Sequence, residues 1–300
     1  MKDIVLYCKS YHRDFLRLKR LLLSIQQFNK DKIDFYISTP ESERKLLDEV
    51  IGDIGGYIWV SDESIICSNP RVKHNIHLDM PGGQSQANIK SEFWRLGFTK
   101  NYVCLDSDCI FIKNFSKADF LDETGTPYTV IFQNKDYFQL SIDRGFSKNI
   151  KNLVSEGDRV KSIFKREGPN YYCHCPPFIW SAAVWRSLDE KYLIPNQLTL
   201  WDLATRDHPE TLIYLEALLK YKAIDLKPIE QLFRVYYYDW QYYFMRRAGE
   251  NLEKIKENYI GVVYQSNWES ELNYGAPNKP FFSRKLKQIK RFLRYLQSYI

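Results

Sequence analysis

The stretch that decides the fold is YVCLDSDCIFI, residues 102–112. Its first four residues are uncharged and mostly apolar, two carboxylates follow at Asp106 and Asp108, and a second apolar run begins at once. A short apolar run that ends at a sharp polar break predicts a buried strand of a parallel sheet. Ligands of open α/β sheets lie beyond the carboxyl ends of the strands, so the two aspartates stand where such a fold does its chemistry.

Carboxylate oxygens are hard ligands that suit Mg²⁺ or Mn²⁺, and Mg²⁺ commonly binds one or two carboxylates together with substrate phosphates. Asp106 and Asp108 are therefore candidate metal ligands. The alternative is a solvated turn, because Asp-x-Asp occurs by chance in many chains. The apolar runs on both sides favour the metal site.

Strands and helices alternate before this stretch. Apolar runs predict strands at 3–8, 33–40 and 57–60, and helical spacing predicts helices at 15–28, 41–51 and 84–97. The segment 61–83, rich in Ser, Asn and Pro, is predicted to be a loop. Strands that alternate with helices in this way indicate right-handed βαβ units and a mainly parallel sheet flanked by helices.

The later part of the chain continues with less regular signals. We predict strands at 128–132 and 260–264, an exposed helical excursion at 143–168, a strand, turn and helix start at 176–185, and a strong helix at 210–221. The segment 233–248 is dense in aromatic residues, and a helix wedged into the core explains most of them.

The run GGQSQANIK at 82–90, the Asp-x-Asp strand after it, and the opening strand followed by Ser10, Tyr11 and a helix carry a resemblance. Together they are similar to bacterial GT-A glycosyltransferase-like proteins encoded with capsule and O-antigen genes. The similarity covers residues 1–115 well and the remainder loosely. It implies a Rossmann-like GT-A domain at 1–270, with a nucleotide-binding half at 1–115 and an acceptor-side half at 116–270, followed by a tail at 271–300.

The resemblance implies that Asp108, with Asp106 directly or through the ribose, holds Mn²⁺ or Mg²⁺ against the diphosphate of a nucleotide sugar. Many GT-A proteins place a third metal ligand, often His, after a late strand. This chain has no His there, so Gln265, Asn267 or water takes that place.

Further donor contacts follow from the same resemblance. Lys90 and Gln86, one helical turn apart, reach the phosphates or the ribose, and Ser10 and Tyr11 bind the base and the ribose. The alternatives are a solvated helix face for Gln86 and Lys90, and a lid over the core for Tyr11.

The resemblance also points to an acidic residue at the start of the 210–221 helix. In inverting GT-A enzymes such a residue deprotonates the acceptor hydroxyl, and Glu210 fits this role best, with Asp207 second. A simpler explanation is that either carboxylate stabilises the positive end of the helix. A retaining mechanism, which needs no such base, stays open.

Two more side chains are candidates for lining the donor-sugar pocket, His174 and Trp180, with plain packing as the alternative for each. Cys173, His174 and Cys175 also suggest zinc, but no second ligand pair accompanies them. Free buried thiols are the preferred interpretation of the six cysteines.

The net charge of +6 comes from the tail. No acidic residue follows Glu271, and without the seven basic residues beyond it the chain is close to neutral, which argues against a nucleic-acid-binding body. From 284 to 300 the apolar residues fall on one arc of a helix and the basic ones opposite. This pattern predicts a peripheral anchor on anionic membrane, and the alternative is a helix that docks its apolar stripe on the body.

We expect a cytoplasmic protein at the inner face of the plasma membrane, since the chain opens directly into a strand and has no spanning segment. The predicted function is a metal-dependent, hexosyltransferase-like glycosyltransferase, with inversion slightly favoured. It uses a nucleotide-sugar donor and a surface-polysaccharide or lipid-linked glycan acceptor. One alternative is a nucleotidyl- or phosphotransferase, against which no glycine-rich phosphate loop is found. Another is an inactive sugar- or membrane-binding scaffold, which the missing late His favours.

Overall fold

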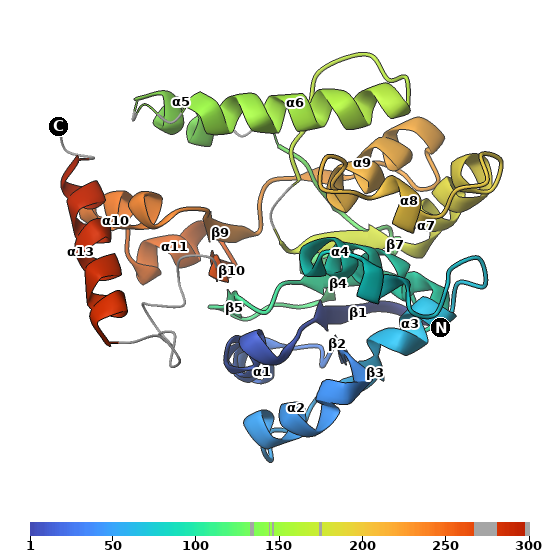
Figure 1. Ribbon diagram of the computed structural model, residues 1–300, viewed down its shortest axis with the longest axis horizontal. Coiled ribbons are helices and arrows are strands. Elements are labelled where there is room, and N and C mark those ends of the chain that lie inside the picture. Colours follow the sequence, from blue (N-terminus) through green and yellow to red (C-terminus); the bar gives the residue numbers. More distant parts are fainter. Residues whose placement is uncertain (133–134, 144, 146, 174–175, 267–280, 298–300) are drawn as a thin grey trace.

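The computed structural model describes residues 1–132, 135–143, 145, 147–173, 176–266 and 281–297. Its main sheet has five strands in the order β3-β2-β1-β4-β7 (Figure 1). Four of them are mutually parallel, namely β1 (Lys2–Lys9), β2 (Phe35–Thr39), β3 (Ile58–Ser61) and β4 (Thr99–Leu105). Only β7 (Phe178–Ser181) runs antiparallel, against β4. The predicted mixed, mainly parallel α/β sheet is confirmed.

Helices cover both faces of this sheet (Figure 1). Ile4, Leu6 and Cys8 of β1 pack in one cluster with α1 (Phe15–Phe28) and α2 (Arg44–Ile51). Val5 and Tyr7 belong to a second cluster, with α4 (Gly82–Glu92), α7 (Ala182–Leu188), α8 (Leu200–Leu203) and α9 (Glu210–Tyr221). Successive strand side chains point to opposite faces, so a strand covered on both sides is apolar throughout.

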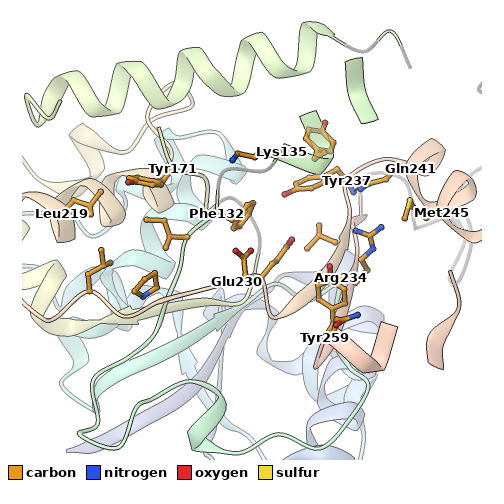
Figure 2. Close-up of a pocket in the computed structure, with 17 residues that line it drawn as sticks. Phe132, Lys135, Tyr171, Leu219, Glu230, Arg234, Tyr237, Gln241, Met245 and Tyr259 are labelled. Carbon is orange, nitrogen blue, oxygen red and sulfur yellow. Dashed lines mark hydrogen bonds between the residues drawn. The ribbon is translucent and has the colours of Figure 1, made fainter. Parts of the chain in front are cut away.

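A second, three-stranded sheet extends the fold beyond Asp108. Its order is β5-β10-β9, with β5 (Cys109–Phe111) antiparallel and β9 (Phe233–Tyr236) parallel to the central β10 (Gly261–Tyr264). A short parallel pair joins β6 (Thr129–Val130) to β8 (Pro228–Ile229). The outer strand β9 lines a large cavity below α6 (Ser147–Ile163), which Figure 2 shows.

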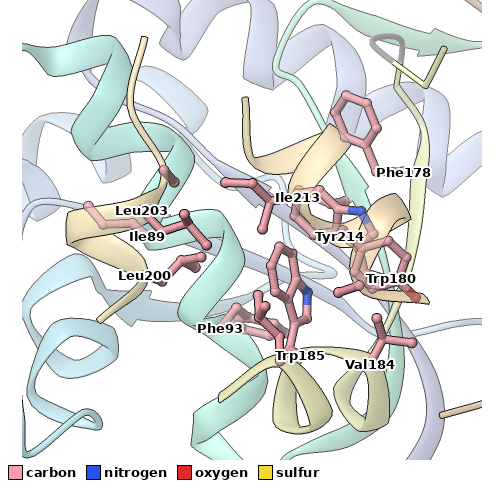
Figure 3. Close-up of a cluster of buried hydrophobic side chains, with 14 of the residues drawn as sticks. Ile89, Phe93, Phe178, Trp180, Val184, Trp185, Leu200, Leu203, Ile213 and Tyr214 are labelled. Atoms are coloured by element: carbon pink, nitrogen blue, oxygen red, sulfur yellow. The ribbon is translucent and has the colours of Figure 1, made fainter. Parts of the chain in front are cut away.

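The core between the main sheet and α7, α8 and α9 is strongly aromatic (Figure 3). The Trp180 ring lies 5.2 Å from that of Trp185 and 5.8 Å from that of Tyr214, centre to centre. Trp180 is only 2% exposed. Its proposed role in lining a donor-sugar pocket is therefore wrong, because α7 and α9 cover it completely.

Local structure differs from the prediction at three places. Residues 61–83 are not simply a loop, since Ser61 caps α3 (Asp62–Cys67) by accepting a hydrogen bond from the Ser64 amide over 3.1 Å. The helix before β4 ends in a 3₁₀ turn, Phe93–Leu96, and Gly97 adopts a φ of +69°. The aromatic segment 233–248 forms β9 and then α10 (Asp239–Arg247) rather than one helix.

The remaining helices lie at the periphery. They are α5 (Lys135–Asp143), α11 (Leu252–Asn258) and α13 (Phe281–Gln297), with short 3₁₀ turns at His12–Asp14, Glu41–Glu43, Ile76–Asp79 and Lys117–Asp119 and a π turn at Asp189–Leu193. The excursion predicted over 143–168 contains α6.

The basic tail forms α13, which lies beside α10 (Figure 1). Its large apolar side chains are between 42% and 83% exposed: Phe281, Phe282, Leu286, Ile289, Phe292, Leu293 and Leu296. The apolar stripe is thus largely exposed, although α13 also contacts α10. None of the described helices combines the length and apolar character needed to cross a bilayer.

The cysteines of the described residues are free thiols. Cys8, Cys104, Cys109 and Cys173 are buried, as expected of thiols in or beside strands, and Cys67 is exposed. His174 and Cys175 lie outside the described residues.

Candidate active site

A cavity of about 380 Å³ opens at the carboxyl edge of the main sheet. It is lined by side chains from the loop after β1, from α4, from the loop after β4, from the start of α9 and from the segment after β10. Seven of the residues predicted from sequence meet here: Tyr11, Gln86, Lys90, Asp106, Asp108, Glu210 and Gln265.

Parallel pairing explains why residues far apart in the chain converge. In the register of β1 and β4, Cys8 lies opposite Leu105, so the two strands end side by side. The next residues of each chain segment, including Tyr11 and Asp106, then leave the same edge of the sheet.

Asp108 is the most enclosed carboxylate of the cavity, with 7% exposure. Its Oδ2 accepts a hydrogen bond from the Ser266 backbone N–H over 2.8 Å, whereas its Oδ1 is buried without a hydrogen-bond partner among the described residues. Burial, and next the nearby Asp106 carboxylate, raise the pKa of Asp108 to about 7. A buried carboxylate with an unpaired oxygen is unfavourable unless a cation joins it.

Lys90 supplies a cation at the inner wall of the cavity. Its side chain is 6% exposed, and its Nζ donates to Oδ1 of Asp106, whose side chain is 31% exposed. Burial opposes the charged ammonium, but the Asp106 carboxylate outweighs it and raises the pKa of Lys90, so the amine stays protonated. Lys90 therefore does not lie on a solvated helix face, and Gln86, one turn earlier, lines the same cavity.

Glu210 begins α9 and reaches the cavity, but Asp207 does not. Burial raises the pKa of Glu210, and the charge on Lys90 opposes this rise. The Asp207 side chain is 76% exposed, with Oδ1 3.8 Å from a guanidinium nitrogen of Arg159. The structure thus places only the first of the two candidate bases at the site.

Of the other residues predicted to contact the donor or the metal, one lines the cavity and one does not. Ser10 is 1% exposed and does not line the cavity, and its Oγ has no hydrogen-bond partner within the described chain. Gln265 lines the cavity after β10. Asn267 lies outside the described residues.

Sequence reasoning missed two contributors, Asp14 and Ser266. Asp14 lines the cavity, and burial raises its pKa although Arg17 pairs with it over 2.6 Å. Its position just after the loop of the first strand was an available signal. Ser266 acts through its backbone, and no sequence pattern indicates that.

The donor set of the cavity fits a divalent cation. Four carboxylates line it, those of Asp14, Asp106, Asp108 and Glu210, and the one lysine among the lining residues is Lys90. Nowhere in the described residues do three or more His, Cys, Asp or Glu side chains form a metal-binding group. Two carboxylates with water and substrate phosphates are nevertheless the usual Mg²⁺ environment, and the unpaired Oδ1 of Asp108 suits it.

Comparisons with known proteins give one family and several similar folds. No curated protein matches the chain in sequence. The fold is similar to mouse xyloside xylosyltransferase 1 in its apo form, with a TM-score of 0.48 and 9% identity, over 88% of this chain and 98% of that one. It is also similar to the galactosyltransferase LgtC in complex with donor and acceptor sugar analogues, with a TM-score of 0.48 and 11% identity, over 94% of each chain. A family model described as a family of unknown function, DUF6492, matches residues 3–243, and the chain therefore belongs to the DUF6492 family.

Proposed function

We propose that the protein is a metal-dependent glycosyltransferase of the GT-A type. It moves a sugar from a nucleotide-sugar donor to a hydroxyl of a surface polysaccharide or lipid-linked glycan. The observation that carries this proposal is the meeting of Asp106, Asp108, Lys90 and Glu210 in one cavity at the carboxyl edge of the sheet.

Asp108 and Asp106 would hold Mn²⁺ or Mg²⁺. When bound, the ion offsets the negative charge that develops on the departing nucleoside diphosphate. Asp108 is held for this task by Ser266, and Asp106 by Lys90. Both carboxylates are therefore oriented by the protein before any ligand arrives.

The donor contacts are assigned to side chains that line the cavity. Lys90, protonated and buried, offers a positive charge to the diphosphate, and the Gln86 amide lies on the same side of α4. Tyr11 lies at the mouth of β1 and suits the base and ribose. Ser10 is buried behind this surface, so we assign it no direct contact.

Glu210 is assigned as the base that takes the proton of the acceptor hydroxyl. A raised pKa brings a carboxylate closer to the working pH, as general-base catalysis requires. This role belongs to an inverting reaction. The anomeric configuration of the product tests this role, because a reaction that retains the configuration does not need Glu210 as a base.

The function is tested with thermal-shift and turnover measurements on the purified protein. Nucleoside diphosphates and nucleotide sugars are added with and without Mn²⁺, and a ligand at 100 times its dissociation constant stabilises the native state by about 2.7 kcal/mol. We expect a metal-dependent shift with one nucleotide family and slow release of nucleoside diphosphate. Release of pyrophosphate instead would indicate nucleotidyl transfer, and the absence of any shift or turnover would refute the proposal.

We also propose that α13 attaches the protein to the anionic cytoplasmic face of a membrane. Apolar side chains such as Ile289 and Phe292 are more than half exposed, and Lys285 and Lys290 are exposed on the same helix. Exposed apolar surface combined with basic charge is typical of helices that bind in the lipid interface. An enzyme that extends a lipid-linked glycan works at that surface.

A further inference from the structure

A second cavity, of about 1060 Å³, lies below α6 and shares no lining residue with the carboxylate cavity. Its walls come from the segment after β6, the start of α5, β8, β9, α10 and the end of α11. Figure 2 shows the labelled side chains of these elements arranged around one space. Its volume is at the upper end of ligand pockets, which suits a chain of sugars better than a single ring.

The two cavities lie at neighbouring strands. Val235 of β9 lines the large cavity and pairs with Val263 of β10, whose continuation supplies Gln265 and Ser266 to the carboxylate cavity. β10 in turn pairs with β5, which begins directly after Asp108. Two strand spacings amount to roughly 10 Å, so a ligand of several sugars can extend from one cavity toward the other.

The lining is aromatic, and all of its aromatic side chains except Phe132 carry hydroxyl groups. Tyr137, Tyr171, Tyr237 and Tyr259 all contribute, and the rings of Tyr137 and Tyr237 lie 5.0 Å apart, centre to centre. A tyrosine presents an apolar face to C–H groups and a hydroxyl that exchanges hydrogen bonds. This combination matches a ligand that is apolar on its ring faces and polar at its edges.

The charges of this cavity are balanced, unlike those of the first. Arg234 pairs with Glu250 over 3.0 Å, and the other charged lining residues are one cation, Lys135, and one anion, Glu230. No excess charge attracts an anion or a metal ion, so the lining favours a neutral ligand.

The lining of this cavity contains a side-chain amide group that lacks a hydrogen-bond partner. Gln231 lines the cavity, and its Nε2 is buried without a hydrogen-bond partner among the residues that the structure describes. A buried donor without an acceptor is unfavourable, and a turn of the Gln231 amide into the cavity would let a ligand oxygen satisfy it. We propose that this cavity binds a neutral oligosaccharide, which under the proposed function is the acceptor glycan.

The test measures binding of the labelled full chain to a printed array of neutral oligosaccharides of two to six sugars. Gln231→Leu removes the amide and keeps an apolar side chain of similar size. We expect glycan binding to weaken about tenfold. The melting temperature should not fall, since the variant removes an unsatisfied donor. Gln139→Leu, at an exposed glutamine of α5 outside the cavity, is the matched control and should bind as the wild type does.

The outcomes separate this proposal from the proposed function. Equal glycan binding by wild type and Gln231→Leu would overturn the assignment of the cavity. The assignment would also be overturned if the wild type shows the metal-dependent nucleotide shift but binds none of the oligosaccharides. Glycan binding that depends on Gln231, in a protein without any nucleotide shift, would support the cavity and refute the transferase.

Discussion

Ser266 donates its backbone N–H to Oδ2 of Asp108 over 2.8 Å, across a sequence separation of 158 residues. This bond ties the end of β10 to the turn between β4 and β5, and it fixes the carboxylate whose other oxygen is unpaired. The candidate metal site is therefore not completed by the N-terminal half of the chain. It requires the small sheet, which brings the late strand back to the carboxyl edge of the main one.

The first prediction concerns Asp108→Asn. The amide oxygen can still accept from Ser266, and the change removes a buried negative charge close to Asp106, so we expect a melting temperature no lower than that of the wild type. Metal catalysis contributes several kcal/mol, so turnover should fall by ~10³-fold or more. Asp225→Asn, at an exposed site, is the control. Full turnover by Asp108→Asn, measured as release of nucleoside diphosphate, would refute the metal assignment.

The second prediction concerns the pair of Lys90 and Asp106. Lys90→Met leaves Asp106 without its cation, and because that carboxylate is 31% exposed we expect a loss of only about 2 kcal/mol in the free energy of unfolding. The double variant Lys90→Met/Asp106→Asn has no unpaired Asp106 carboxylate. Its loss in the free energy of unfolding should therefore be smaller than the sum of the losses of the two single variants. Urea denaturation of the four proteins measures this coupling, and additive losses would show that the pair does not interact.

Much of this site was predictable because parallel strands end at a common edge. An apolar run and a carboxylate pair were enough to place Asp106 and Asp108 at that edge, whereas Lys90 and Gln86 followed from the resemblance. Glu210 required the resemblance as well, since its position at a helix start has a sufficient electrostatic explanation of its own.

What could not be predicted depends on tertiary packing. The burial of Trp180 follows from two helices that pack over it, and its local sequence does not reveal them. The contribution of Ser266 is a backbone contact set by strand register, which composition does not encode. The large tyrosine-lined cavity joins segments from Ile131 to Tyr259, and no single segment has a recognisable motif.

The third prediction is a pH dependence outside the site. Glu92 is fully buried, and burial raises its pKa above the ordinary 4.5 although Arg95 opposes this. The folded state then binds the proton more tightly than the unfolded state, so ionisation of Glu92 lowers stability as pH rises from about 4.5 through the folded pKa. Glu92→Gln removes this ionisation and can still accept from Asn69, which donates over 2.9 Å.

Relative to the wild type, Glu92→Gln should therefore gain stability as the pH rises from about 4.5 through the raised pKa of Glu92 in the folded state, by about 1.4 kcal/mol for each unit by which that pKa is raised. Urea unfolding at a series of pH values measures the difference. A difference that stays constant with pH would show that Glu92 titrates alike in the folded and unfolded states.

The fourth prediction concerns the exposed face of α13. Ile289 and Phe292 are 55% and 58% exposed, and moving such side chains into lipid contributes about 1 kcal/mol each when they are partly inserted. Ile289→Glu/Phe292→Glu should therefore weaken binding to vesicles rich in phosphatidylglycerol by more than ~10-fold, as measured by flotation. Leu46→Glu, at an apolar side chain of α2 that is 42% exposed, should bind like the wild type. A wild type that binds neither anionic nor neutral vesicles, and self-associates through this face instead, would make α13 a protein contact and refute the membrane proposal.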